Sequence, residues 1–353
     1  MKWRKMLWTM AVCVSLVFAL NMLNVAFVPS PAQAQEKESV KVGLMFDATG
    51  PTFTWGSQSP IGGRAYVRYL NKKGGINGHR IDAIEHEMGY KVPLAVEGFE
   101  RYRREGVVTY WAWGTPIVYA LTEKTTEAKI PTTTPGFGRA DATDGKRFPY
   151  IFPIAATYWS QAGASIKFIM DQWAKEGKKG KPKIGYVYFD NPAGTEPIVI
   201  FEKLQQQVGY EFKKWAIPSP GIEQSAAVLD AVTRYKADWV ISHLFGQGPS
   251  VLIKELYRNG FPMNRVIGFV WAAGEMDMEA AGWDASEGYY TLQYAGVGSD
   301  FPLVKDIAKV LYQDAGFPIP EMMTRYSVGY NRGIFWMGVS LEATRIALEK
   351  YGS

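Results

Sequence analysis

The chain has 353 residues, of which 47% are hydrophobic and 21% are charged, and these values are typical of a globular protein. At roughly 100–200 residues per domain, this length predicts two lobes rather than one. One cysteine excludes an intramolecular disulfide framework, a zinc cluster and an iron–sulfur site. Three histidines leave little for a multi-histidine metal site, so we expect no metal and no cofactor. The net charge of +5 is too small to indicate a nucleic-acid-binding protein. The 12 tryptophans suggest an aromatic surface somewhere in the fold.

Residues 1–34 have the pattern of a secretory signal peptide. A basic start at 1–5 precedes a mostly apolar stretch from Met6 to about Val28, and the small-x-small site Ala32-Gln33-Ala34 follows. This pattern predicts export and cleavage after Ala34. A retained membrane anchor is the alternative for the apolar stretch. Lipid attachment at Cys13, the only cysteine, is a further alternative that the residues before it fit poorly.

Beyond residue 39, short apolar runs alternate with longer helical patterns in two blocks. In the first block we expect strands at 40–46, 81–86, 107–113 and 131–134. We expect helices at 61–71 and 92–104, and a third helix that follows the turn at 114–116 and ends at about 128. In the second block we expect strands at 183–189, 210–215, 237–244 and 265–271 and helices at 197–208, 223–235 and 249–259. Such alternation favours parallel sheets with right-handed crossovers. The predicted fold is α/β with two doubly wound lobes, whose ligands lie beyond the carboxyl ends of the strands.

The sequence contains no motif that indicates catalysis. A GxxxxGK[ST] phosphate loop and a GxSxG elbow are absent, and Gly246-Gln247-Gly248 lacks the third glycine of a dinucleotide fingerprint. Carboxylates near the predicted strand ends are not paired into an acid/base couple; they are Asp47, Asp190 and Glu275. The basic run at 175–182 is typical of a solvated loop. We therefore expect neither an enzyme nor a nucleic-acid partner.

The three histidines lie in different predicted elements and show no metal-binding spacing. His79 follows a glycine-rich turn and is expected to be solvated, and His86 ends a strand. His243 lies near the end of another strand. A structural role is the favoured reading for His243, and a position facing the cleft is the alternative.

Three stretches carry a resemblance to a known family. They are Gly43–Pro51 followed by Trp55-Gly56, the run Asn71–Arg80 (NKKGGINGHR), and Glu287-Gly288 after Ala280-Ala281-Gly282. In this order they resemble the branched-chain-amino-acid type of periplasmic solute-binding protein, which feeds an ABC importer. The resemblance runs from about Val40 to Tyr351, and the Asn71–Arg80 run is its most specific part.

The resemblance implies a type I periplasmic binding fold, in which two α/β lobes joined by three hinge strands close over a ligand. One lobe would take 39–154 plus 296–353 and the other 155–295. It also implies a periplasmic, monomeric protein that captures a small molecule and delivers it to a membrane permease. A ligand-sensing receptor of the same fold is the alternative. Relatives continue past the position of Ser353, so we expect the sequence to be shortened at its C-terminal end.

The resemblance also implies candidate ligand contacts, carried over one position at a time. An aromatic contact falls on Trp55, and a hydroxyl that grips a ligand carboxylate falls on Thr115, after Trp113. Backbone contacts fall on Gly136 and Gly138, with Phe137 between them. The family has a threonine at the position of Gly138. In the other lobe the matching positions are Tyr158, Ala193, Phe245 and Trp271.

Trp271 takes the place of the acidic residue that pairs with the ammonium group of an amino-acid ligand. Since tryptophan supplies a flat face but no negative charge, we expect a carboxylate ligand with an aromatic or otherwise flat body. A quaternary-ammonium ligand and a branched-chain amino acid are the alternatives. Aromatic residues inside strands are expected in the core, namely Trp111, Tyr186 and Trp239. Those at or beyond strand ends are expected in the cleft, namely Trp55, Trp113, Phe137, Tyr158 and Trp271.

Overall fold

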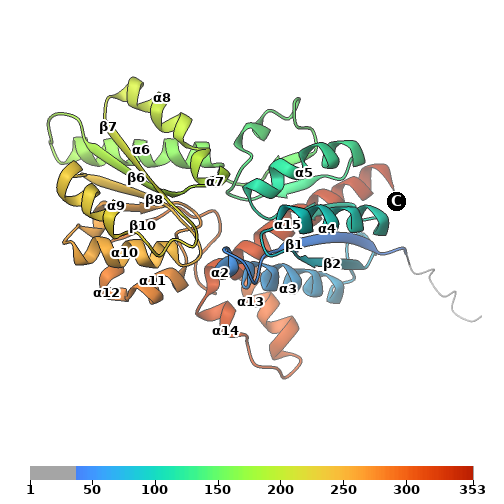
Figure 1. The fold of residues 1–353 in the computed structure, drawn as a ribbon. Coiled ribbons are helices and arrows are strands. Elements are labelled where there is room, and N and C mark those ends of the chain that lie inside the picture. The colour runs from blue at the N-terminus through green and yellow to red at the C-terminus, as the bar shows by residue number, and fades with distance from the viewer. Residues whose placement is uncertain (1–36, 353) are drawn as a thin grey trace, which may run out of the picture. The chain divides into compact units, whose positions relative to one another are not determined.

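Two parallel β-sheets of five strands each organise the chain (Figure 1). The computed structural model describes residues 37–352, so the predicted signal segment at 1–34 lies outside the described residues. The first sheet has the order β2-β1-β3-β4-β5 and consists of β1 (Val40–Phe46), β2 (Ile81–Glu87), β3 (Thr109–Trp111), β4 (Thr132–Thr134) and β5 (Ile151–Pro153). The second has the order β10-β9-β8-β6-β7 and consists of β6 (Lys183–Phe189), β7 (Glu211–Ile217), β8 (Trp239–His243), β9 (Val266–Gly268) and β10 (Tyr290–Thr291). The expected α/β fold with two parallel sheets is confirmed.

Helices connect successive strands, as parallel pairing requires. Around the first sheet they are α2 (Phe53–Gly56), α3 (Ser59–Lys72), α4 (Val92–Glu105), α5 (Thr115–Ala128) and the 3₁₀ turn η1 (Ala140–Thr143). Around the second they are α6 (Tyr158–Lys175), α7 (Pro192–Thr195), α8 (Ile198–Val208), α9 (Ser225–Leu229), η2 (Asp230–Tyr235), α10 (Gly248–Arg258), η3 (Met263–Arg265), α11 (Glu275–Ala281) and α12 (Trp283–Ser286). The chain ends with α13 (Pro302–Ala308), η4 (Lys309–Gln313), α14 (Glu321–Thr324) and α15 (Ser327–Tyr351).

Two predicted strands are shorter in the structure because their last residues turn out of the sheet. The strand expected at 265–271 ends at Gly268. The amide of Phe269 still donates to the carbonyl of Ser242 on β8, and a turn closed by the amide of Ala272 on the carbonyl of Phe269 then takes the chain out of the sheet. The strand expected at 107–113 likewise pairs only over Thr109–Trp111. The residues released from the two sheets include both Trp113 and Trp271.

The strand order places loops from both sheets where a doubly wound fold binds ligands. In the first sheet β1 pairs with both β2 and β3, and in the second β6 pairs with both β7 and β8. The crossover direction therefore reverses between β1 and β3 and between β6 and β8, and the loops that follow these strands border the crevice typical of such switch points. Both sheets belong to one compact unit that begins at Ser39.

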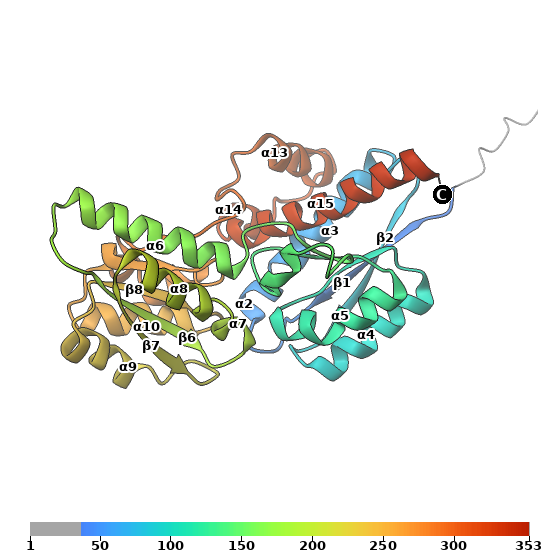
Figure 2. The ribbon, with the colours of Figure 1, turned by 90° about the horizontal axis from the view of Figure 1, so that it is seen from above.

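The C-terminal helix α15 returns the chain to the first sheet, where it packs along α3 (Figure 2). A β-carbon at Gly62 of α3 or Gly333 of α15 would lie closer than 3.0 Å to backbone of the facing helix, so these glycines permit the close approach. Trp336 of α15 stacks on Trp111 with ring centroids 4.1 Å apart, and its Nε1 donates to Thr133 Oγ1 at 2.7 Å. The lobe limits 39–154 plus 296–353 and 155–295 stay predictions.

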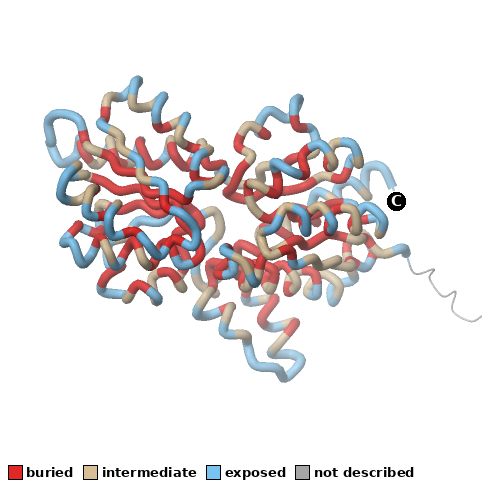
Figure 3. Tube along the Cα trace, in the orientation of Figure 1, coloured by how far each residue is buried: buried red, intermediate tan, exposed pale blue. Residues whose placement is uncertain are grey.

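The buried core is built on the inner strands of both sheets, which are β1, β3, β4, β6, β8 and β9 (Figure 3). Trp111, Tyr186 and Trp239 are at most 1% exposed, which confirms their predicted core positions. The expectation for His79 is wrong: it is only 6% exposed. The turn at Gly75 explains this, because Ile76 and His79 exchange backbone hydrogen bonds of 2.9 Å that fold the segment back on itself. Within residues 37–352, no helix combines the length and apolarity that a membrane span needs.

Candidate functional site

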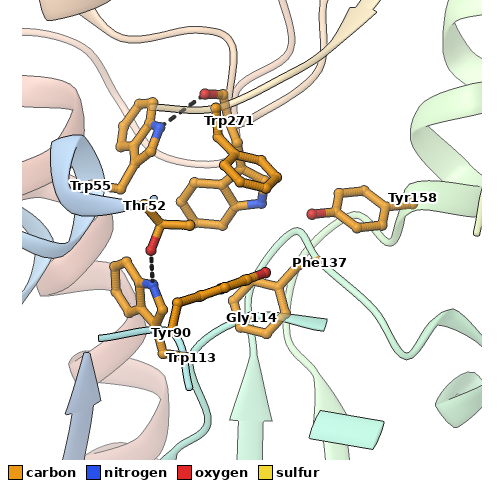
Figure 4. Close-up of a pocket in the computed structure, with 9 residues that line it drawn as sticks. Thr52, Trp55, Tyr90, Trp113, Gly114, Phe137, Tyr158 and Trp271 are labelled. Carbon is orange, nitrogen blue, oxygen red and sulfur yellow. Dashed lines mark hydrogen bonds between the residues drawn. The ribbon is translucent and has the colours of Figure 1, made fainter. Parts of the chain in front are cut away.

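An aromatic pocket lies where loops from the two sheets meet (Figure 4). From the first sheet's side it is lined by residues that follow β1, β2, β3 and β4, which are Thr52, Trp55, Tyr90, Trp113, Gly114 and Phe137. From the second side it is lined by Tyr158, at the start of α6, and by Phe245 and Trp271, which follow β8 and β9. These are the carboxyl ends of parallel strands, where doubly wound folds place their ligands.

Trp271 is the centre of the aromatic wall. Its ring centroid lies 5.4 Å from that of Trp55 at an interplanar angle of 78°, an edge-to-face contact. It also lies 6.3 Å from the ring of Trp113 and 5.8 Å from that of Phe137. The indole Nε1 of Trp55 donates to the carbonyl oxygen of Trp271 at 2.9 Å. This hydrogen bond connects the loop after β1 to the loop after β9, so it joins one sheet's side of the pocket to the other's.

The polar atoms of Thr52 are committed to holding the pocket's shape. Its Oγ1 accepts a hydrogen bond from Trp113 Nε1 at 2.8 Å and donates to Asp47 Oδ2 at 2.6 Å. Asp47 is completely buried and also accepts from the amides of Gly50 and Thr52. The carboxylate noted at the end of β1 is therefore a structural anchor of the β1–α2 loop, with its charge satisfied by three donors.

Tyr158 supplies a hydroxyl on the second sheet's side, directed toward Trp271 in Figure 4. Burial raises the pKa of Tyr158 well above its usual value, so the hydroxyl stays protonated and can donate. Behind it, the ring of His243 lies 4.2 Å away and its Nδ1 is 2.8 Å from the hydroxyl of Tyr186. Burial lowers the pKa of His243 to about 3, so this imidazole is neutral. His243 is a buried structural residue, as the sequence favoured, and does not line the pocket.

The pocket is narrow in this arrangement of the side chains. Its cavity volume is about 20 Å³. This is room for one or two waters, since a water needs roughly 10–15 Å³. Trp55, Tyr158 and Trp271 are each at most 7% exposed. A ligand of several carbon atoms therefore requires the walls to move apart.

The structure brings most of the predicted contact residues to this pocket. It is lined by Trp55, Trp113, Phe137, Tyr158, Phe245 and Trp271, all proposed from the sequence. Thr115 and Gly136 do not line it. Thr115 is fully buried, and its Oγ1 accepts from the amide of Gly138 at 3.2 Å, while the carbonyl of Gly136 accepts from Gln161 at 3.0 Å.

Sequence reasoning missed three lining residues, Thr52, Tyr90 and Gly114. Thr52 and Gly114 are close neighbours of Trp55 and Trp113, so proximity to named residues was an available signal. Tyr90 was not recognisable, because it lies in a turn before α4 with a positive φ of 58° that no local pattern marked.

A second contact between the two sides lies beside Gly138. The carboxylate of Glu196, between α7 and α8, accepts from the amide of Ala140 at 2.8 Å and from the hydroxyl of Tyr119 at 3.0 Å. Burial raises the pKa of Glu196, and its Oε2 finds no hydrogen-bond partner among residues 37–352. A β-carbon at Gly138 would lie 2.5 Å from Oε1 and 2.6 Å from Cδ. The missing side chain at Gly138 thus makes room for this carboxylate.

Nothing in the described part of the chain suggests a metal centre: no group of three or more histidine, cysteine, aspartate or glutamate side chains is placed to hold an ion. Glu275, the other carboxylate noted from the sequence, accepts from Ser327 Oγ at 2.7 Å and from the amide of Val328 at 3.1 Å. It therefore caps the first turn of α15, where a negative charge is favourable.

Several solved structures share this fold. A protein from the Pseudomonas fluorescens group described as an ABC transporter permease is 33% identical, with a TM-score of 0.79 over 89% of this chain and 77% of that one. A branched-chain amino acid ABC transporter protein from Thermus thermophilus with bound valine is 21% identical, with a TM-score of 0.77 over 90% and 80%. A fatty acid ABC transporter substrate-binding protein from Thermomonospora curvata is 20% identical, with a TM-score of 0.72 over 88% and 77%.

A search of curated proteins finds no match. The family comparison, by contrast, covers most of the described chain, because residues 39–329 match the model of the periplasmic binding protein family. This agrees with the resemblance carried by the sequence motifs and with the two parallel sheets of the type I fold. The chain therefore belongs to the periplasmic binding protein family.

Proposed function

We propose that this protein is the substrate-binding component of an ABC importer, exported to the periplasm, and that it captures a small carboxylate with an aromatic or otherwise flat body. The observation that carries the proposal is the pocket itself, whose wall is built from aromatic rings of both sides of the crevice. Membership of the periplasmic binding protein family and the 33% identity to a protein described as part of an ABC transporter support the transport role.

The chemistry of the wall supports the ligand class. Its lining residues include no aspartate or glutamate, so an ammonium group would enter without a charged partner at a cost of several kcal/mol. Rings such as Trp55, Trp113 and Trp271 instead offer faces and edges against which a flat, apolar body packs well. The Tyr158 hydroxyl and the amide at Gly114, which precedes α5, are the donors available to a carboxylate.

Capture proceeds by closure. With so little space in the present arrangement, a ligand enters only when the two sides part, and it then favours the closed state by contacting both. The closed form is the one that a membrane permease would recognise. No covalent step is needed, and the protein acts as a binding partner rather than as an enzyme.

A thermal-shift screen tests the proposal. Benzoate, phenylacetate, hexanoate, leucine and valine would be compared, with methyl benzoate and benzylamine as matched compounds that lack a carboxylate. A ligand at a hundred times its Kd stabilises the folded state by about 2.7 kcal/mol, which a melting curve detects readily. The proposal predicts a rise in Tm for an aromatic carboxylate and none for its ester or amine. A rise with leucine or valine alone would contradict the proposed ligand class.

A further inference from the structure

A buried arginine lies behind the aromatic wall. Arg332 of α15 is completely buried, and its guanidinium carbon lies 4.3 Å from the ring centroid of Trp55 and 5.2 Å from that of Trp271. The ring of Tyr294 lies 4.9 Å away. One cation therefore contacts a tryptophan from each side of the pocket, at distances where a desolvated cation–π interaction is favourable.

The polar partners of Arg332 are few for a buried charge. Its Nη2 donates to Gln293 Oε1 at 2.6 Å, while Nε and Nη1 find no hydrogen-bond partner within residues 37–352. No carboxylate of the described chain forms an ion pair with it, and burial lowers its pKa to about 10. A buried cation this poorly paired costs stability. The rings and Gln293 contact it directly, and the charges of Asp277 and Glu275 favour its charged form without forming an ion pair.

Gln293, in the segment that follows β10, connects Arg332 to the loop that contains Trp271. Its Nε2 donates to the carbonyl of Ala273 at 2.8 Å, in the loop that also contains Trp271. The side chain of Arg332 thus contacts the Trp271 loop in two ways, through the indole face and through Gln293. On its other side it covers Trp55, whose Nε1 donates to the Trp271 carbonyl.

We propose that Arg332 is a positioning residue of the ligand pocket: it holds Trp55 and Trp271 against each other across the crevice and so fixes the pocket's aromatic wall. Arg332 does not itself line the pocket. This inference rests on the proposed ligand pocket for its functional meaning, but its test needs no ligand. Failure of the ligand screen and failure of the present inference are therefore distinguishable.

The Trp55 indole proton reports directly on the contact. In ¹⁵N-labelled protein, the indole signals of Trp55 and Trp113 are assigned from their absence in the Trp55→Phe and Trp113→Phe variants, and their exchange with D₂O is timed. Trp113 is the internal control, because its Nε1 donates to Thr52 and it makes no cation–π contact with Arg332. Arg345→Met, on the same helix but with a guanidinium paired to exposed Glu342 and Glu349, is the matched variant.

Arg332→Met should speed exchange of the Trp55 proton by about tenfold, which corresponds to about 1.4 kcal/mol, and leave the Trp113 proton within about twofold. Arg332→Lys keeps the charge and should preserve part of the protection, and Arg345→Met should change neither signal. Unchanged Trp55 exchange in folded Arg332→Met would overturn the proposal, as would equal acceleration at Trp113. If that variant does not fold, Gln293→Ala tests the same link: faster exchange at Trp55 alone supports the proposal and no change refutes it.

Discussion

The contact between Glu196 and Gly138 gives a stability prediction that follows from geometry. In Gly138→Ala, the new β-carbon would lie 2.5 Å from Glu196 Oε1 and 2.6 Å from Cδ. Real β-carbons are essentially never found closer than 3.0 Å to another atom. The carboxylate is the end of a flexible side chain, so we expect it to swing away rather than the backbone to shift. It would then lose the hydrogen bonds from the Ala140 amide and the Tyr119 hydroxyl.

The magnitude follows from those two bonds. Hydrogen bonds to a charged group contribute about 1.5–3 kcal/mol each, but Glu196 is only partly buried and water will replace part of what is lost. We therefore expect Gly138→Ala to lower the free energy of unfolding by about 2 kcal/mol, including a small opposing gain from the stiffer unfolded chain. Glu196→Ala alone should cost a similar amount.

Guanidinium denaturation of the two single variants and the double variant measures the coupling. In the Glu196→Ala background the steric conflict is gone, so Gly138→Ala should be neutral or stabilising by about 0.4–1 kcal/mol. Equal destabilisation by Gly138→Ala in both backgrounds would refute the reasoning, because it would show that Glu196 is not what the glycine accommodates.

Three further predictions concern the pocket and the core. The contribution of His243 to the free energy of unfolding should fall as the pH drops from about 6.5 toward 3, by about 1.4 kcal/mol per unit for one proton, because burial depresses the pKa of His243 to about 3 and only the unfolded chain takes up the proton. Buried Asp277, whose pKa is raised to about 7, contributes a slope of opposite sign, so the His243 contribution is read as the difference in slope between the wild type and His243→Gln in denaturation curves; identical slopes would exclude it. Trp271→Glu should weaken the wild-type ligand at least about tenfold in titration calorimetry, whereas Trp283→Glu, at a site 62% exposed, should not; equal affinity would place Trp271 outside the site. Trp336→Ala should lower stability by about 3–5 kcal/mol, since it removes the stack on Trp111 and the bond to Thr133; a loss below about 1 kcal/mol would contradict its core role.

The elements with strong local patterns were predictable from the sequence. The strand at Lys183–Phe189 has the predicted bounds, and the helix at Val92–Glu105 differs from its prediction by one residue. The ends of β3 and β9 were not, because Trp113 and Trp271 continue an apolar run. After β9 the chain leaves the sheet in a turn in which the amide of Ala272 donates to the carbonyl of Phe269.

The pocket was predictable in its aromatic residues and not in the groups that position them. Trp271 follows a predicted strand, so the carboxyl-end rule placed it near the crevice. Arg332 lies within an ordinary helical run and Glu196 in a short connection. Their roles depend on partners far away in the chain, such as Trp55 and Tyr119, which no local pattern reveals.

A crystal structure of the complex with the ligand that raises Tm most in the screen tests the central claim most directly. The account predicts that the ligand lies in this pocket, with its flat body against the wall formed by the indole rings of Trp55 and Trp271 and its carboxylate near the hydroxyl of Tyr158. A ligand bound elsewhere on the molecule, or an aromatic wall unchanged and still closed around its narrow space, would contradict the claim that this pocket is the binding site.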